Sequence, residues 1–273
     1  MAIVTISREL AALGDETAHE LVDILHYRLV GKKSLEDRML NLGASEQKLH
    51  KYDERKPSFW ASLSQDRDDY LHYLKSAVFS EAGQGNCVFI GRGCEALLRP
   101  VPGVLSVFLT APLPIRIERV KSYFQCDEKR AEQIIGQSDR DREGFHQYFF
   151  EMKWKEPSNY HLTLNTGFLH PDLCARLIKT SLEDRQSEET ETENALRIKD
   201  MILGQQIVHH ILFDKAIPVH FLDVTAVSGA VTLYGVVNAP SFAEAAVQGA
   251  GEVPAVCSVK SEIQVVQEYS IVR

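Results

Sequence analysis

The chain has 273 residues, of which 44% are hydrophobic and 25% are charged, and it contains 16 glycines and 10 prolines. This is ordinary globular composition, which excludes a mainly disordered, a collagen-like or a disulfide-scaffold protein. Thirty basic residues against 38 acidic ones give a formal net charge of −8, without the large basic field that binding to duplex nucleic acid requires.

Short apolar runs alternate with longer amphipathic stretches over the first part of the chain. We expect strands at residues 2–6, 27–30, 87–90, 104–109 and 160–164, and helices near 15–26, 34–52, 66–83, 112–124, 127–151 and 170–182. Near-continuous apolar strands separated by helices are typical of a parallel sheet covered on both faces. Ligands of such sheets bind beyond the carboxyl ends of the strands, so the residues that follow each strand are the functional candidates.

The acidity of the chain is concentrated in residues 183–194, which hold six acidic residues, one arginine and no large apolar side chain. Such a segment is typical of a solvated linker or a helix extension. We therefore place one domain at residues 1–182, an acidic linker at 183–194 and a second domain at 195–273. In the second domain we expect a helix at 195–213, strands at 219–227 and 230–237, a short helix from Ser241 and a strand near 256–266.

The cysteines of the chain are odd in number and scattered, without a CxxC pair or the spacing of metal ligands. This usage favours a reducing compartment. The first residues lack the basic segment and longer apolar run of a secretory signal, and no stretch approaches the roughly 18 apolar residues of a transmembrane helix. We expect a cytoplasmic protein with no transmembrane segment and no protein-held metal.

The residues after the first strand lie where a phosphate-binding loop would open a helix. Ser7 and Arg8 end the strand, Gly14 is followed by no lysine, and Asp15 and Glu16 place negative charge where a phosphate would dock. The same acids suit a helix N-terminus. Taken alone, these residues favour a capped helix over a phosphate site.

An arginine between two glycines, Gly91-Arg92-Gly93, follows the strand at 87–90. A sharp turn there would present the guanidinium to the crevice, where arginine makes bidentate contacts to phosphate or carboxylate. The alternative is a turn whose arginine pairs with a nearby acid such as Glu95.

Two helices with charged faces follow. Arg116 and Arg119 share a face of one, and Asp139 and Arg142 share a face of the next. These helices form either a lid that carries cations to a transferring phosphoryl group or solvated, salt-bridged helices. Asn165, after the last strand of the first domain, either contacts a base or caps a turn.

Taken in order, these residues resemble the cytidylate kinase-like family of nucleoside monophosphate kinases. The matching segments are residues 6–9 (Ile-Ser-Arg-Glu), 53–59 (Asp-Glu-Arg-Lys-Pro-Ser-Phe), 85–93, 111–113, 116–119, 139–142, 157–160 and 164–166. The resemblance covers residues 1 to about 182. It implies a P-loop NTPase-type parallel sheet and transfer of a phosphoryl group from ATP to CMP or dCMP with Mg²⁺.

The resemblance also implies roles for the candidate residues. Arg92 would bind the acceptor phosphate, while Asp139 and Arg142 would serve the acceptor nucleotide and the lid. The implied nucleotide-binding residues are Ser7, Arg8, Gly14, Arg116, Arg119 and Asn165.

The chain departs from the family at the phosphate loop. Ala11-Ala12-Leu13-Gly14-Asp15 stands in place of Gly-Ser-Gly-Gly-Arg, and His161 stands where the family favours aspartate. A loop cation beside the transferring phosphate contributes on the order of 10³ in rate. We therefore expect a nucleotide-binding regulatory or sensing protein with weak or lost kinase activity, a pseudokinase. An active CMP/dCMP kinase and a non-catalytic assembly scaffold are the alternatives.

The second domain resembles a BON domain. The resemblance rests on the pattern from Val224 through Gly229, Val231 and Leu233 to Gly235. It implies a small α+β binding module with an unidentified ligand or protein partner, and homo-oligomerisation is one of the assemblies open to it. The histidines at 209, 210 and 220 are interpreted as structural.

Overall fold

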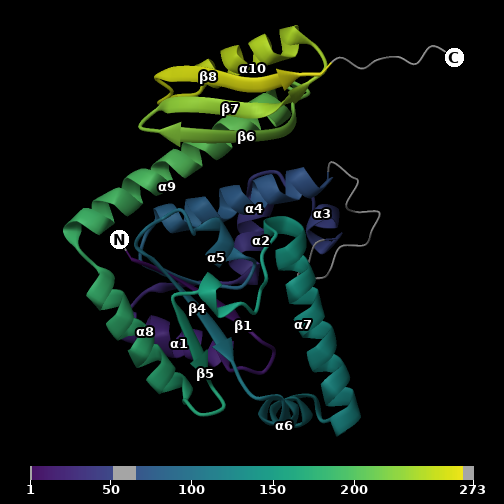
Figure 1. The fold of residues 1–273 in the computed structure, drawn as a ribbon, viewed down its shortest axis with the longest axis vertical. Coiled ribbons are helices and arrows are strands. Elements are labelled where there is room, and N and C mark those ends of the chain that lie inside the picture. Colours follow the sequence, from purple (N-terminus) through teal and green to yellow (C-terminus); the bar gives the residue numbers. More distant parts are fainter. Residues whose placement is uncertain (1, 52–65, 267–273) are drawn as a thin grey trace, which may run out of the picture. The chain divides into compact units, whose positions relative to one another are not determined.

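The computed structural model describes residues 2–51 and 66–266. It divides into two compact units, residues 1–194 and 195–273. The predicted fold class is confirmed, because a parallel sheet with helices is followed by a small α+β unit (Figure 1). None of the described helices combines the length and the apolar character that crossing a membrane requires.

The first unit is built on a five-stranded parallel sheet. Its strands are β1 (Ile3–Arg8), β2 (Arg28–Val30), β3 (Cys87–Ile90), β4 (Val104–Thr110) and β5 (Leu162–Asn165). They are ordered β2-β3-β1-β4-β5, so the chain fills one side of β1 before it crosses to the other. The carboxyl end of β1 is therefore the switch point of the sheet, where open α/β sheets bind ligands.

Helices cover both faces of this sheet because its central strands are apolar on both sides. Side chains of α1 (Gly14–Leu25) and α8 (Pro171–Arg185), such as Leu21 and Ile178, pack on Val4 and Ile6 of β1, and Figure 1 shows the two helices side by side. The other helices that the structure describes in this unit are α2 (Lys32–Asn41), α3 (Glu46–Lys51), α4 (Asp66–Gly83), α5 (Cys94–Leu97), α6 (Leu113–Phe124) and α7 (Glu128–Phe150), with a 3-10 turn at Pro157–Asn159.

Two predicted elements of this unit have different bounds in the structure. The single helix expected at 34–52 is divided into α2 and α3, because Gly43 adopts a φ of 100° and ends the first of them. The strand expected at 160–164 begins at Leu162, since the 3-10 turn precedes it and the Tyr160 hydroxyl donates to the Trp154 carbonyl.

The expected acidic linker is mostly helical. α8 continues to Arg185 and α9 (Glu188–His209) follows, so only Gln186 and Ser187 of the twelve residues lie outside helices. The acidic residues of the first turn of α9 suit the positive end of its dipole. The Asn194 side chain is buried and accepts a hydrogen bond from the Gly103 N–H at 2.9 Å, which attaches this part of α9 to the first unit.

The second unit packs helices against a three-stranded sheet. α9 ends in a π-helical turn (His210–Asp214), followed by β6 (His220–Val227), β7 (Ala230–Val237), α10 (Pro240–Glu252) and β8 (Ser258–Val265). β6 and β7 are antiparallel across a tight turn, in which Ser228 and Gly229 have φ of 50° and 85°. β7 and β8 are parallel, with α10 as the crossover. Ile207, Ile211 and Leu233 lie at the centre of the core.

Candidate functional site

A cavity of about 350 Å³ lies at the carboxyl end of β1, over the loop that joins β1 to α1. Its wall comes from this loop, the first turn of α1, the end of α6 and one residue of α7. Its charged and aromatic lining consists of Arg8, Glu9, Asp15, Glu16, Arg119, Tyr123, Phe124 and Arg142. The position is the one expected for a ligand site of an α/β sheet, and its charges of both signs balance.

The loop at the cavity floor has a strained backbone. Ala11 and Leu13 adopt φ of 60° and 52°, a conformation that costs an L-residue about 1–2 kcal/mol. Gly14 is required by packing, because a Cβ there would lie 2.5 Å from the Arg8 Cγ. The guanidinium of Arg8 in turn lies 3.8 Å from the Asp15 carboxylate.

Two backbone donors of the loop are already engaged within the protein. The Leu10 N–H donates to the Asp139 carboxylate at 3.4 Å, and the Ala12 N–H donates to the Glu9 carbonyl at 3.2 Å. A phosphate-binding loop uses such N–H groups to cradle the phosphates. Here those two groups are directed to acceptors of the chain itself.

Arg119 and Thr166 fix the loop from the outside. The Arg119 guanidinium donates to the Ala11 carbonyl at 2.9 Å and to the Thr166 carbonyl at 2.7 Å. The Thr166 hydroxyl donates to the Ala12 carbonyl at 3.0 Å. Burial lowers the pKa of Arg119 from its ordinary value, and the charge of Glu16 opposes this. Arg119 therefore positions the loop as well as lining the cavity.

A cluster of four charged side chains adjoins the cavity next to the loop, and of these four only Glu9 is among the residues that line the cavity. The Lys155 ammonium lies 2.7 Å from a Glu9 oxygen and 2.9 Å from an Asp139 oxygen, and Arg116 donates to the same Asp139 oxygen at 2.9 Å. The other Glu9 oxygen accepts from the Thr110 hydroxyl at 2.6 Å. Burial alone would lower the pKa of Lys155, but its hydrogen bonds to the two carboxylates hold that pKa above its ordinary value.

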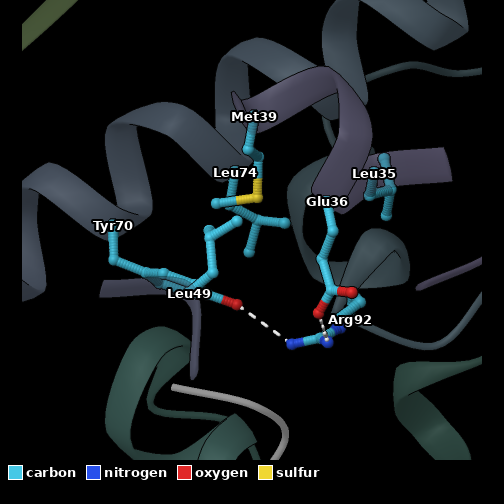
Figure 2. A pocket seen from close by; sticks show the side chains of 7 residues that line it. All are labelled: Leu35, Glu36, Met39, Leu49, Tyr70, Leu74 and Arg92. Atoms are coloured by element: carbon cyan, nitrogen blue, oxygen red, sulfur yellow. Dashed lines mark hydrogen bonds and ion pairs between the residues drawn. The ribbon is translucent and has the colours of Figure 1, made fainter. Parts of the chain in front are cut away.

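Arg92 lies in a second pocket, apart from the cavity, shown in Figure 2. Its side chain is 2% exposed, and its guanidinium donates to Glu36 at 2.7 Å and to the Tyr70 hydroxyl at 3.2 Å. Apolar side chains of α2, α3 and α4, among them Met39, line the same pocket beside the pair. The turn is tight as predicted, with a φ of 58° at Arg92.

The alternative partner expected for Arg92 was wrong. Glu95 instead accepts from the His146 ring at 2.6 Å, and Glu36 pairs with Arg92. Asp139 accepts from Arg116 and Lys155, while the Arg142 guanidinium donates to the Ser138 hydroxyl, four residues earlier on α7, at 2.5 Å. Packing between elements selects the partners of Arg92 and Glu95, whereas Arg142 bonds along its own helix.

Three further residues singled out from the sequence lie outside the cavity lining. Ser7 is buried and accepts from the Trp154 indole at 2.8 Å. Asn165 caps its own turn by accepting from the Gly167 N–H at 2.9 Å. The His161 ring accepts from the Ser106 N–H at 3.0 Å, next to β4.

The structure therefore brings together at the cavity Arg8, Gly14, Arg119 and Arg142, with Arg116 and Asp139 in the adjoining cluster. The motif at residues 53–59 lies outside the described residues. Sequence reasoning missed Lys155, for which no motif gives a signal, and Glu36. Within residues 2–51 and 66–266, no group of three or more His, Cys, Asp or Glu side chains is placed to hold a metal ion.

Two known protein families match the sequence of this chain. The profile of the cytidylate kinase-like family matches residues 3–167, and that of the BON domain matches residues 199–267. A search of curated proteins finds no match.

A solved structure shares the fold at low sequence identity, and two others are similar at lower TM-scores. An uncharacterized protein from Eubacterium ventriosum is 20% identical, with a TM-score of 0.53, over 67% of this chain and 99% of that one. The YorR protein from Bacillus subtilis, in complex with phosphorylated GDP, is 12% identical, with a TM-score of 0.39, over 68% and 100% of the two chains. Shikimate kinase from Acinetobacter baumannii, in complex with shikimate, is 13% identical, with a TM-score of 0.39, over 68% and 96%.

Proposed function

The chain belongs to the cytidylate kinase-like family and carries a BON domain, and on that premise we propose that it is a nucleotide-binding regulatory protein with weak or lost phosphoryl transfer. Its first unit takes a nucleotide at the carboxyl edge of the sheet. Its second unit takes a ligand, a protein partner or a second copy of the chain.

The observation that supports this proposal most directly is that the loop between β1 and α1 has engaged backbone donors and acidic neighbours. The N–H groups of Leu10 and Ala12 are engaged by acceptors of the chain, while Asp15 and Glu16 line the cavity. None of the described residues that line it is a lysine. A transferring phosphoryl group needs positive charge and preorganised donors at this point, and the loop supplies opposing charge.

The acceptor pocket supports the same proposal. An acceptor phosphate that reaches Arg92 has to displace the carboxylate of Glu36, which already holds a charge-assisted hydrogen bond of 2.7 Å to a nearly buried guanidinium. Hydrogen bonds to charged groups contribute about 1.5–3 kcal/mol. A CMP-type nucleotide therefore binds in competition with Glu36, an arrangement suited to a sensor that responds when the ligand is abundant.

An active CMP/dCMP kinase is the second candidate, because the cavity keeps Arg8, Arg119 and Arg142 in its wall. Arginines from a lid stabilise the charge of a transferring phosphoryl group. An assembly scaffold without nucleotide binding is the third.

Calorimetry with CMP separates the scaffold from the other two. We expect CMP to bind the full chain, and Arg92→Ala to weaken binding by at least about tenfold. Arg99→Ala, which removes an exposed arginine of the same unit, is the matched control and should leave the affinity unchanged. Absence of CMP and ATP binding at millimolar concentration would contradict the proposal in favour of the scaffold.

A further inference from the structure

Two carboxylates from distant parts of the chain converge on one ammonium group beside the cavity. Glu9 follows β1, Asp139 lies on α7, and Lys155 follows α7. The two carboxylate residues are 7% and 8% exposed, whereas the lysine side chain is 42% exposed. The ammonium also lies 5.5 Å from the centre of the Trp154 ring, within cation–π range.

This position is where a divalent cation would find its ligands. Carboxylate oxygens are the protein ligands that Mg²⁺ prefers, and in nucleotide sites one or two of them share the ion with phosphate oxygens. Glu9 belongs both to the cluster and to the cavity wall. Asp139 is connected to the cavity through the N–H of Leu10.

The residues present do not fit a divalent cation. The same two oxygens that an ion would need accept from Lys155 at 2.7 and 2.9 Å. Arg116 places a second positive charge 2.9 Å from Asp139 and 3.5 Å from Glu9. Two carboxylates and two cations already balance, so an ion would have to expel the lysine and lie against the guanidinium.

We propose that the Lys155 ammonium takes the place of a divalent cation between Glu9 and Asp139, so that this site binds its nucleotide without Mg²⁺. The tethered cation holds α7 to the loop after β1 and supplies positive charge next to a loop that has none of its own. The part of this inference that concerns nucleotide rests on the proposed function, whereas the part that concerns the cation does not.

The experiment uses the full chain and Mn²⁺ alone as the probe. Bound Mn²⁺ is counted by electron paramagnetic resonance in the wild type, in Lys155→Ala and in Lys153→Ala, an exposed lysine two residues away. We expect the wild type and Lys153→Ala to bind Mn²⁺ with a Kd weaker than about 1 mM. Lys155→Ala frees the two carboxylates, so its Mn²⁺ affinity should be at least about tenfold higher and Mn²⁺ should raise its melting temperature.

A second measurement does not depend on how well the variant folds. The wild type is titrated with ATP by calorimetry in Mg²⁺ and again in excess chelator, and we expect the two Kd values to agree within about twofold. A loss of more than about tenfold in chelator would overturn the proposal. A stoichiometric Mn²⁺ site in the wild type that Asp139→Asn abolishes, or a folded Lys155→Ala without gain of Mn²⁺ binding, would overturn it as well.

The two proposals fail in distinguishable ways. If ATP binds in neither buffer, the nucleotide site over the loop is contradicted. The Mn²⁺ titrations, which contain no nucleotide, then decide the role of Lys155 by themselves.

Discussion

Arg92 and Glu36, 56 positions apart in the sequence, form a 2.7 Å ion pair in which the arginine side chain is 2% exposed. Figure 2 shows the pair at one side of a pocket that is also lined by the apolar side chains of Leu49, Met39 and Leu74. An arginine expected to receive a phosphate is thus already neutralised by a carboxylate from α2. The affinity of this pocket for an anionic ligand is set by the competition between the two.

Removing that competitor should strengthen acceptor binding. In Glu36→Gln the amide keeps the shape but loses the charge, so we expect the affinity for CMP to rise by about tenfold. Isothermal titration measures the change. Asp37→Asn, the exposed acid next to it on α2, removes the same charge from the helix and should have little effect. Equal gains in both variants would show a general charge effect and contradict the competition.

Asn194, on the part of α9 that belongs to the first unit, makes a buried hydrogen bond to Gly103. Asn194→Ala leaves the Gly103 N–H without its acceptor, and an unsatisfied buried donor costs about 1–3 kcal/mol. Denaturant unfolding should show that loss. Glu193→Ala, one residue earlier and exposed, should change stability little. An unchanged midpoint in Asn194→Ala would contradict a stabilising role for this hydrogen bond.

A histidine of the second unit should carry a pH dependence. The two ring nitrogens of His210 lie 3.0 Å from Asp214 and 3.3 Å from Glu252. The hydrogen bond to Asp214, followed by that to Glu252, raises the pKa of His210 above its ordinary value. Because the folded pKa is raised, the stabilisation is fully present below about pH 6.5 and is lost as pH rises through the folded pKa.

Melting of the full chain between pH 5 and pH 8 measures this contribution, at values on either side of the ordinary histidine pKa of about 6.5. We expect His210→Gln to remove part of the loss of stability towards pH 8. His220→Gln, an exposed histidine of β6, serves as the control. If neither variant changes the dependence of the melting temperature on pH, the hydrogen bonds of His210 to Asp214 and Glu252 are not its cause.

The strained loop itself offers a fourth test. Ala11 and Leu13 hold positive φ, so the substitution of residues 11–15 by Gly-Ser-Gly-Gly-Arg removes strain and adds a cation beside the cavity. We expect the affinity for ATP to rise by at least about tenfold. Calorimetric titration of the variant with ATP measures the change. If Asp15→Arg alone gives the whole gain, the charge at position 15 accounts for the weak binding of ATP. The strained backbone at Ala11 and Leu13 then makes no contribution to it.

The apolar runs predicted the sheet because burial on both faces leaves no alternation along a strand, as in Ile3–Ile6. The break at Gly43 escaped the pattern, since amphipathic spacing continues across it and only the positive φ ends the helix. The ion pairs between distant residues could not be predicted from the sequence, for a different reason. Lys155 meets Glu9 across 146 positions, and only the folded topology brings such charges together.

Only part of the candidate site could be predicted, because the contacts within it also depend on the folded topology. The rule that ligands lie at the carboxyl ends of strands led to Arg8, and the charged helix faces led to Arg119 and Arg142; all three line one cavity. It gave no means to see that Arg92 lies in a separate, closed pocket with Glu36. A local motif predicts the edge of the sheet at which a residue lies. The ion-pair partner of that residue depends on how the helices pack.

The central claim is that this chain binds nucleotide but transfers phosphoryl groups weakly or not at all. A coupled assay with ATP and CMP on the full chain tests it most directly. We predict turnover at least about 10³-fold below the 1–100 s⁻¹ typical of kinases, with CMP binding retained in calorimetry. Turnover within that range, abolished by Arg92→Ala, would contradict the account and identify a working kinase.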